Sequence, residues 1–446
     1  MKRQWTRVLG TAATFWMLAI PAAQSNLDDK IDSNIADWVG TYKYLHEHPE
    51  LSTEERETSA LVAGQLKKMG YQVTDHFGQY QDGKTAYGVV AMLHNGSGPT
   101  LYVRTDMDAL PVTENTGLSY ASKVREKQPN GEVGVMHACG HDLHMTVFLG
   151  TAKMLAEAKD KWSGTLVLIG QPAEEGFGGA DAMLRAGLYD KFPKPDYVIA
   201  LHDSAAIPAG TVAWHSGPLL AGSDSLDITI RGFGGHGAMP NATKDPIVIG
   251  AELVVALQTI VSRESDPLTP TVVTVGSFHA GTKHNIIPDE AHLQLTVRSM
   301  TSAQREKLLA AIKRMTNGIA EAAGIPADRS PIIEVSKNII PATINDAALT
   351  PRVAASLEKA LGKENVWPGE PIMASEDFSL FAMEGPKPPI CMFWLGASDP
   401  EKWKQAREKG TRLPGPHSSE FAPLPEPAIR AGVKAMTTAA TDLLQK

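Results

Sequence analysis

The chain has 446 residues, more than one ordinary domain holds, so about two or three domains are expected. Its hydrophobic content of 43% is ample for a packed core. The formal net charge of −8 comes from interspersed acidic and basic residues without a basic stripe, so nucleic-acid binding has no electrostatic support.

The N-terminus has the pattern of an export signal. A positively charged start, residues 2–7, is followed by the apolar run 8–20 and by small residues at 21–23 that suit cleavage. We therefore expect residues 1–24 to be a signal peptide for general secretion, which would place the mature protein in the periplasm or outside the cell. An uncleaved membrane anchor is the alternative. No later segment is expected to be a membrane helix.

Strands and helices alternate after this signal. Helical spacing covers 34–48 and 51–69, and an amphipathic helix follows residue 142. Three short apolar runs have the composition of strands buried on both faces: 100–104, 164–170 and 197–201. This alternation predicts an α/β domain with a mainly parallel sheet.

The pattern changes near residue 223. Alternating polar and apolar residues predict four half-exposed strands: 225–231, 269–279, 291–299 and 331–335. Helical spacing lies between them at 246–261 and 303–323. The order βαββαβ predicts a ferredoxin-like domain of about 110 residues, inserted into the first domain. The expected division is a signal peptide, a large domain in two parts and the inserted small domain between them: 1–24, 25–222, 223–336 and 337–446.

The most distinctive stretch is 136–144, Met-His-Ala-Cys-Gly-His-Asp-Leu-His. The chain has only two cysteines, and Cys139 lies two residues before His141. A thiolate and an imidazole this close together are good ligands for a borderline-soft divalent metal. Cys391 lies in an apolar, strand-like segment and is expected to be a small buried side chain, with a disulfide to Cys139 as the alternative.

Polar side chains follow three of the predicted strands, and a late loop rich in Pro and Gly carries one more: Asp106, Asp108, Glu174, Glu175, His202 and His417. Ligands gather at the carboxyl ends of strands in open α/β sheets. The adjacent glutamates are not expected to face one way, so one should bind metal while the other points at the reacting centre. With Cys139 and His141, this set would suit two metals that share a bridging ligand and a water.

Residues 232–237, Gly-Phe-Gly-Gly-His-Gly, match the dinucleotide-binding fingerprint. The match is weak, because residues 239–241 intervene before the helix and the preceding strand is half-exposed. We therefore reject a dinucleotide site and expect the glycines to allow a tight turn from which His236 projects. Neither G-x-S-x-G nor H-E-x-x-H occurs in the chain.

In combination and in order, these motifs resemble those of the di-metal aminoacylase/carboxypeptidase superfamily of metallopeptidases. Within it, the chain is similar to the branch of hippurate hydrolases and indole-3-acetyl-amino-acid hydrolases. The matching motifs span essentially the whole mature chain: 104–111, 136–144, 171–176, 201–202, 232–240, 284–288, 373–378 and 416–417. Other relatives place a bridging Asp where Cys139 stands, whereas this branch uses Cys. The exported N-terminus is less usual for the branch.

The resemblance implies two divalent metal ions and a set of five ligands: Cys139, His141, Glu175, His202 and His417. Glu174 would be the general acid/base, and Asp108 would orient a ligand. A set with Cys and three His favours Zn²⁺ or Mn²⁺ and also admits Co²⁺ or Ni²⁺. His144 is expected to lie outside the set. Residues 376–377 either support a ligand or cap the following helix.

The resemblance also assigns roles to the small domain, which would act as a lid and form a homodimer. His236 would reach the active site of the neighbouring subunit, where it would stabilise the oxyanion. Asn285 and Arg298 would hold the carbonyl and the carboxylate of the substrate, since the guanidinium fork matches a carboxylate.

The expected reaction is hydrolysis of the amide bond of an N-acyl amino acid by a metal-activated water and Glu174. One alternative is an exported metallo-carboxypeptidase or dipeptidase of the same fold. A second alternative, from another class, is a non-catalytic binding protein whose metal site is structural.

Overall fold

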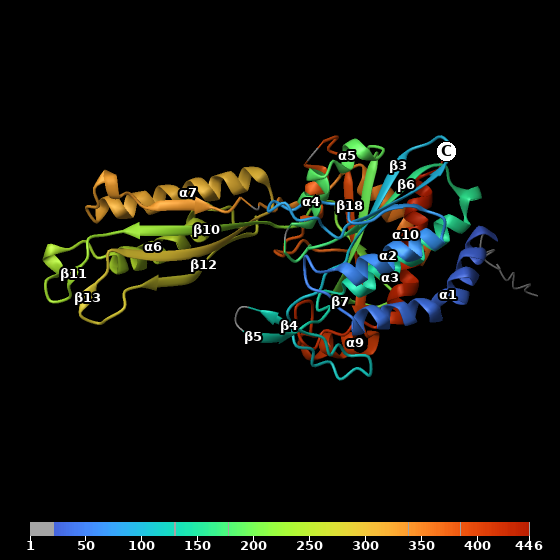
Figure 1. Cartoon of the computed structure of the whole chain (residues 1–446), viewed down its shortest axis with the longest axis horizontal. Helices are drawn as coiled ribbons and strands as arrows, with labels where there is room; N and C mark the ends of the chain where they lie inside the picture. Colours follow the sequence, from blue (N-terminus) through green and yellow to red (C-terminus); the bar gives the residue numbers. More distant parts are fainter. Residues whose placement is uncertain (1–21, 129–130, 177, 338, 384, 446) are drawn as a thin grey trace, which may run out of the picture.

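Two separate sheets organise the molecule, one in a broad body and one in a narrow body that projects from it (Figure 1). The computed structural model describes residues 22–128, 131–176, 178–337, 339–383 and 385–445. The expected signal peptide therefore lies outside the described residues, apart from 22–24, which begin the first helix.

The broad body contains an eight-stranded sheet. Its strands, in spatial order, are β1 (Gln72–Thr74), β2 (Val89–Asn95), β6 (Gly164–Gln171), β3 (Thr100–Asp106), β7 (Tyr197–Pro208), β18 (Ile390–Ser398), β8 (Val212–Trp214) and β17 (Val366–Pro368). The pairs from β6 to β18 are parallel, while β1, β2 and the β18–β8 pair run antiparallel. The mainly parallel sheet predicted from the sequence is confirmed.

Helices cover both faces of this sheet. One face carries α1 (Ala22–Glu47), α2 (Arg56–Lys68), α3 (His141–Glu157), α8 (Leu349–Leu361) and α10 (Pro425–Leu443). The other face carries α4 (Gly179–Arg185), α5 (Leu188–Lys191) and the 3-10 helix η6 (Asp377–Ala382). Because helices cover both faces, the central strands are buried and mainly apolar, and all eight residues of β6 are buried.

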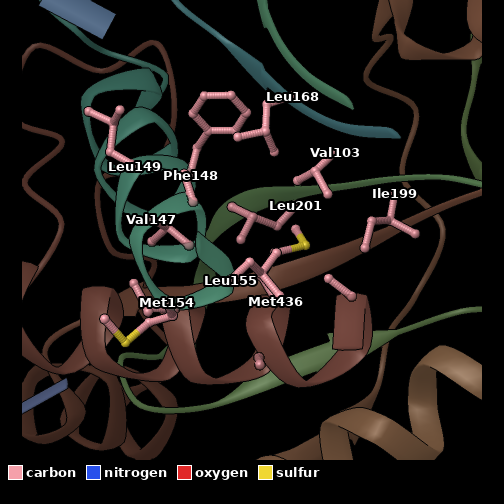
Figure 2. Close-up of a cluster of buried hydrophobic side chains, with 14 of the residues drawn as sticks. Val103, Val147, Phe148, Leu149, Met154, Leu155, Leu168, Ile199, Leu201 and Met436 are labelled. Atoms are coloured by element: carbon pink, nitrogen blue, oxygen red, sulfur yellow. The ribbon is translucent and has the colours of Figure 1, made fainter. Parts of the chain in front are cut away.

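Figure 2 shows the core between the sheet and the helices α3 and α10. Phe148 and Leu155 from α3 lie close to Leu168 from β6 and Met436 from α10 in the same cluster. Burying such a side chain contributes about 1.5–3 kcal/mol. This packing fixes the start of α3, and therefore the position of His141, relative to the strand ends.

The narrow body is the small domain. Its sheet order is β12 (Thr271–Ala280), β14 (Glu290–Ser299), β10 (Gly222–Arg231) and β15 (Ile332–Val335), with α6 (Pro246–Thr259) and α7 (Ser302–Ala322) packed against it. All three strand pairs are antiparallel, which with the chain order βαββαβ confirms the predicted ferredoxin-like arrangement. The boundary residues 223 and 336 themselves stay predictions.

Shorter elements lie around these two sheets: β4 (Arg125–Gln128), β5 (Gly131–Gly134), β9 (Gly217–Leu220), β11 (Gly235–His236), β13 (Ile286–Ile287), β16 (Thr343–Asn345) and α9 (Pro400–Lys409). The strands β9 and β16 pair with each other close to where the chain enters and leaves the small domain. The strands β11 and β13 form the outer tip of that domain (Figure 1).

Two predicted helix starts were wrong. The helix expected at 34–48 begins already at Ala22. The expected helix 51–69 begins only at Arg56, because the preceding residues form a turn. The carboxylate of Glu50 accepts hydrogen bonds from the backbone amides of Glu57 and Thr58, which satisfies donors at the new helix start. Residues 51–55 are therefore free to contact the large domain's loops.

The expectation of no further apolar span was also wrong. By length and composition, one helix among the described ranges could cross a membrane: Pro246–Glu264, with a mean hydropathy of 1.5. Its inner side chains Ile249, Leu253 and Leu257 are buried in the small-domain core. The sequence predicted only that 246–261 is helical, and the outer face of this helix is apolar as well, with Val248 and Val255 exposed on it.

A buried ion cluster ties α1 to α3. His46 Nδ1 lies 2.7 Å from Asp142 Oδ2, and His46 Nε2 lies 3.1 Å from Glu114 Oε1. Burial alone would lower the pKa of His46, but the hydrogen bonds with Asp142 and then Glu114 raise it to about 10. The imidazole is therefore a buried cation between two carboxylates at neutral pH.

This cluster predicts a pH dependence of stability. Because the folded-state pKa of His46 is raised, its stabilisation is complete below about pH 6.5 and is lost as the pH rises towards about 10. His46→Gln should cost about 3–5 kcal/mol at pH 6, because buried carboxylates lose their cation. Urea unfolding from pH 6 to 10 measures both effects. Equal pH slopes for the two proteins would contradict the prediction.

Candidate metal centre

The pair Cys139 and His141 lies at the beginning of α3, which starts at His141. Gly140 between them has a φ of 72°, the left-handed conformation that favours glycine. A Cβ at this position would lie 2.7 Å from the carboxylate of Asp203. The Cys-Gly-His spacing thus turns the chain sharply and presents both side chains to the strand ends.

The five expected ligands lie together in two groups that share one residue. Cys139, His141 and His202 form the first group, and Cys139, Glu175 and His417 form the second. Within each group the possible ligand atoms lie within 4.8 Å of one another, and Cys139 Sγ lies 3.6 Å from His202 Nε2. A thiolate common to two groups is suited to bridge two metals.

Backbone carbonyls orient two of the histidines. His141 Nδ1 donates to the carbonyl oxygen of Asp108 at 2.8 Å, and His202 Nδ1 donates to that of Asp203 at 2.8 Å. Since a carbonyl can only accept, each Nδ1 carries a hydrogen, so in the neutral ring Nε2 is the nitrogen left to offer a lone pair. His141 Nε2 is buried and makes no hydrogen bond. Such an orphaned nitrogen fits a metal ligand.

The last ligand comes from a distant loop. His417 has a φ of 69°, and its backbone amide donates to the carbonyl of Ala138 at 2.7 Å. Its Nε2 lies 3.3 Å from Glu175 Oε1. One backbone hydrogen bond beside Cys139 therefore brings this half-exposed imidazole to the second group.

The two glutamates face the same way, contrary to the expectation from the sequence. His141 Nε2 lies 3.9 Å from Glu174 Oε2 and 4.0 Å from Glu175 Oε1. Ala173, just before them, has a φ of 46°, and Asp108 accepts from the amides of Glu174 and Glu175 at 3.1 and 3.0 Å. This tight turn converges both carboxylates, which an ordinary loop would not do.

His202 was expected to end its strand, but β7 continues to Pro208. The strand is longer because it pairs with β18 beyond His202, as far as Ser398. The ligand is therefore held inside a paired strand, which fixes its backbone more firmly than a loop would.

Burial and charge set the protonation of the site. Burial first, and then the charges of Glu376 and Glu175, raise the pKa of Glu174 well above its usual range. Burial and the charges of Glu175 and Glu174 likewise raise the pKa of the Cys139 thiol. A divalent cation bound here would lower both pKa values again, since it deprotonates a coordinating thiol and offsets the charge of neighbouring carboxylates. The donor set therefore fits a two-metal centre.

Arg104 holds the carboxylates behind the site. This fully buried guanidinium donates to Asp106 and Glu376 at 2.7 Å each and to Asp377 at 3.2 Å. Glu376 also accepts from the amide of Phe378 at 3.0 Å, so it both supports the site and caps η6. No role was predicted for Arg104. The available signal was a charged residue within an apolar strand, two residues before Asp106.

His144 lies outside both groups. Its Nδ1 lies 2.7 Å from an oxygen of Asp106, and its Nε2 accepts from the amide of Asp203 at 2.8 Å. Both ring nitrogens of His144 are therefore hydrogen-bonded within the protein, which leaves neither with a free lone pair for a metal.

The predicted site residues of the small domain lie at its two opposite ends. Arg298, on β14, donates to the hydroxyl of Ser375 in the large domain. Burial lowers the pKa of Arg298. His236 and Asn285 are exposed at the opposite tip, where β11 pairs with β13 (Figure 1). The chain thus does not bring them to its own metal centre.

The glycines before His236 let neighbouring backbone segments pack closely against this stretch of chain. A Cβ at Gly232 would lie 2.2 Å from the carbonyl of Lys244, and one at Gly234 would lie 2.6 Å from that of Ile287. Neither has the positive φ of a tight glycine turn. The segment packs against neighbouring loops instead of opening a helix.

Together, the mainly parallel sheet, the projecting small domain and the two ligand groups beside a buried glutamate define a metal-dependent hydrolase with a catalytic and a lid domain. The chain belongs to Peptidase family M20/M25/M40, whose family model matches residues 102–413. It is a hydrolytic enzyme that acts on amides, so the alternative of a non-catalytic binding protein is wrong.

Relatives cover most of the chain. Thermostable carboxypeptidase 1 of Saccharolobus solfataricus is 37% identical over 405 residues, which are 90% of this chain and 94% of that protein. Hippurate hydrolase of Campylobacter jejuni is 41% identical over 340 residues, 76% of this chain and 82% of that protein. The structure of the YXEP protein of Bacillus subtilis, a dinuclear metal-binding M20 peptidase, aligns with a TM-score of 0.74 and 28% identity, covering 93% of this chain and 99% of that one.

Proposed function

We propose that the enzyme hydrolyses N-acyl amino acids to a carboxylic acid and a free amino acid. The proposal rests on one observation: two groups of possible metal ligands share Cys139 and lie beside the buried carboxyl of Glu174. The similarity to a hippurate hydrolase supports an acyl or aryl-acyl amino acid as the substrate.

Glu174 is the proton carrier in this proposal. Its carboxylate takes a proton from the attacking water and returns it to the amide nitrogen as the C–N bond breaks. Its position 3.9 Å from His141 Nε2 places it at the edge of the first ligand group, and its burial keeps bulk water from competing for the proton.

The five ligands would hold two divalent ions: Cys139, His141, Glu175, His202 and His417. When bound, such ions polarise a water and lower its pKa towards neutrality. Zn²⁺ or Mn²⁺ suits this mixture of thiol, imidazole and carboxylate, and Co²⁺ or Ni²⁺ fits as an alternative. Asp108 keeps the ligands aimed, because it binds the backbone of both glutamates.

Arg298 is proposed to bind the α-carboxylate of the substrate. Arg298→Ala should raise KM for hippurate about 10–100-fold with a smaller change in kcat, because a charge-assisted hydrogen bond contributes roughly 1.5–3 kcal/mol. Steady-state kinetics with hippurate and with its carboxamide analogue measure this. The variant and the unaltered enzyme should treat the carboxamide alike. A loss with the carboxamide as large as the loss with hippurate would contradict the role.

His236 and Asn285 are proposed to act in the site of a partner subunit, with Asn285 contacting the substrate carbonyl. The amide of Ala238 donates to His236 Nδ1 at 3.0 Å, so Nε2 carries the hydrogen and is suited to donate to an oxyanion. The outer face of α6 supports a homodimer, since Val248 and Val255 are 53% and 71% exposed.

A mixed dimer tests this arrangement. His236→Ala and Glu174→Gln should each be inactive alone, but co-refolded together they should recover about a quarter of full activity. Half of randomly paired dimers are mixed, and each mixed dimer has one intact site. Activity of the mixture is measured against its dimer content by ultracentrifugation. Mixed dimers without any recovery would contradict action between subunits.

A substrate panel tests the function itself. Hippurate, N-acetyl amino acids and dipeptides are compared side by side, before and after chelation and after return of Zn²⁺ or Mn²⁺. The proposal expects metal-dependent release of amino acid from the N-acyl substrates. Preference for peptides would favour the second candidate, an exported metallo-carboxypeptidase or dipeptidase, which the similarity to a carboxypeptidase supports.

We also infer export to the periplasm or the medium. The support is the N-terminal sequence alone, with its charged start, apolar run and small residues at 21–23. Cell fractionation, with N-terminal sequencing of the mature protein, tests this inference.

A further inference from the structure

A loop that was expected to be helical contacts the turn that carries Glu174 and Glu175. Glu55, the residue before α2, is fully buried. Its Oε1 accepts hydrogen bonds from the backbone amides of Thr53 and Ala173, at 2.8 Å each. Both donors are non-glycine residues in the left-handed conformation, with φ of 73° and 46°. One carboxyl oxygen therefore holds two strained residues, and one of them directly precedes Glu174.

The contact continues along the chain. The next two amides, of Glu174 and Glu175, bind the two oxygens of Asp108. Asp108 Oδ2 also accepts from the hydroxyl of Ser52, which lies on the same loop as Glu55. Three consecutive amides, 173–175, are therefore held by two buried carboxyl groups. A left-handed non-glycine residue persists only where its surroundings hold it, so loss of one acceptor should let the turn relax.

We infer that Glu55 is a positioning residue of the active site, which aims Glu174 and Glu175 by holding the amide of Ala173. The inference rests on the proposed function for the role of Glu174, and on the ligand groups for that of Glu175. Glu55 acts through the backbone, because both hydrogen bonds to its Oε1 come from backbone amides.

The charge state of Glu55 suits this role. Burial first, and then the negative charge of Asp108, raise the pKa of Glu55 to about 8. A glutamine has the same shape as the protonated acid and an oxygen that can accept from the amide of Ala173. Glu54, its exposed neighbour, offers a matched control.

The experiment compares Glu55→Ala, Glu55→Gln, Glu55→Asp and the control Glu54→Ala. The readouts are kcat and KM for hippurate, and the dissociation constant of Zn²⁺ from competition with a coloured chelator. Glu55→Ala should lower kcat about 100-fold with KM changed less than about threefold, because a small misplacement of a reacting group has that effect. Its Zn²⁺ affinity should fall about 10–100-fold. Glu55→Gln should recover most of both losses, and Glu54→Ala should match the unaltered enzyme.

Wild-type kcat and Zn²⁺ affinity in Glu55→Ala would overturn the inference, as would a Glu55→Gln enzyme as impaired as Glu55→Ala. If Glu55→Ala does not fold, Glu55→Asp decides. The aspartate carboxyl is one methylene too short to reach the amide of Ala173, so kcat of Glu55→Asp should be low where kcat of Glu55→Gln is high. Equal kcat values for the two variants would overturn the inference. If the unaltered enzyme hydrolyses no substrate of the panel, the proposed function fails, while the Zn²⁺ affinities still decide the role of Glu55.

Discussion

A Glu174→Gln enzyme is expected to keep its metals and lose its turnover. The amide has the shape of the carboxylate but cannot accept the proton of water or return it to the leaving amine, so kcat should fall by roughly 10²–10⁴-fold. The turn itself should persist, because Asp108 binds the backbone amide of residue 174 and not its side chain. Rates of hippurate hydrolysis and metal content by atomic emission, measured on one preparation, check both halves of the expectation.

The exposed Glu54→Gln is the matched control and should behave like the unaltered enzyme. Two results would contradict the assignment of Glu174. Near-full activity would show that the proton is carried elsewhere. Loss of metal together with activity would show that Glu174 acts as a ligand. The test is needed because Glu174 Oε2 lies close to His141 Nε2, one of the expected ligand atoms.

Loss of Cys139 should remove metal from both ligand groups, because its sulfur is common to them. Cys139→Ala is therefore expected to bind fewer than two metals per chain and to lose activity in parallel, with an affinity at least about 10²-fold weaker. Metal titration followed by activity measurement checks this. Mild peroxide should have the same effect on the unaltered enzyme, since oxidation removes the thiolate as a ligand.

Cys391 provides the control for the substitution of Cys139. Cys391 is a free thiol buried in β18, as the sequence indicated, and the two cysteines form no disulfide. Cys391→Ala should keep both metals and respond to peroxide like the unaltered enzyme, with only a modest loss of stability from the small cavity. A Cys139→Ala enzyme that still holds two metals would refute the bridging role.

Patterns that depend on local burial were predictable. The apolar run 164–170 became β6, and the alternation of 225–231 became β10, because side-chain periodicity records which faces of a strand are covered. Element lengths were less predictable. The strand β7 runs past His202 only because β18, almost 200 residues later in the chain, pairs with it.

The candidate site shows the same division. Residue types and spacing identified Cys139, His141 and one of the pair Glu174 and Glu175 as candidate ligands, since few side chains bind divalent metals. The family resemblance assigned the ligand role to Glu175. The convergence of Glu174 and Glu175 was not predictable. It depends on the strained turn at Ala173 and on acceptors that come from two other segments of the chain.

The sequence by itself determined the class of fold, the order of elements in the small domain and the residue types available for chemistry, because these follow from local periodicity and from side-chain identity. Only the tertiary structure decided that one sulfur is common to two ligand groups, that backbone carbonyls set the histidine tautomers, and that His236 lies far from its own chain's metal centre. The physical reason is that these features are distances between segments far apart in the chain. Sheet pairing and core packing set such distances, and local sequence does not encode them.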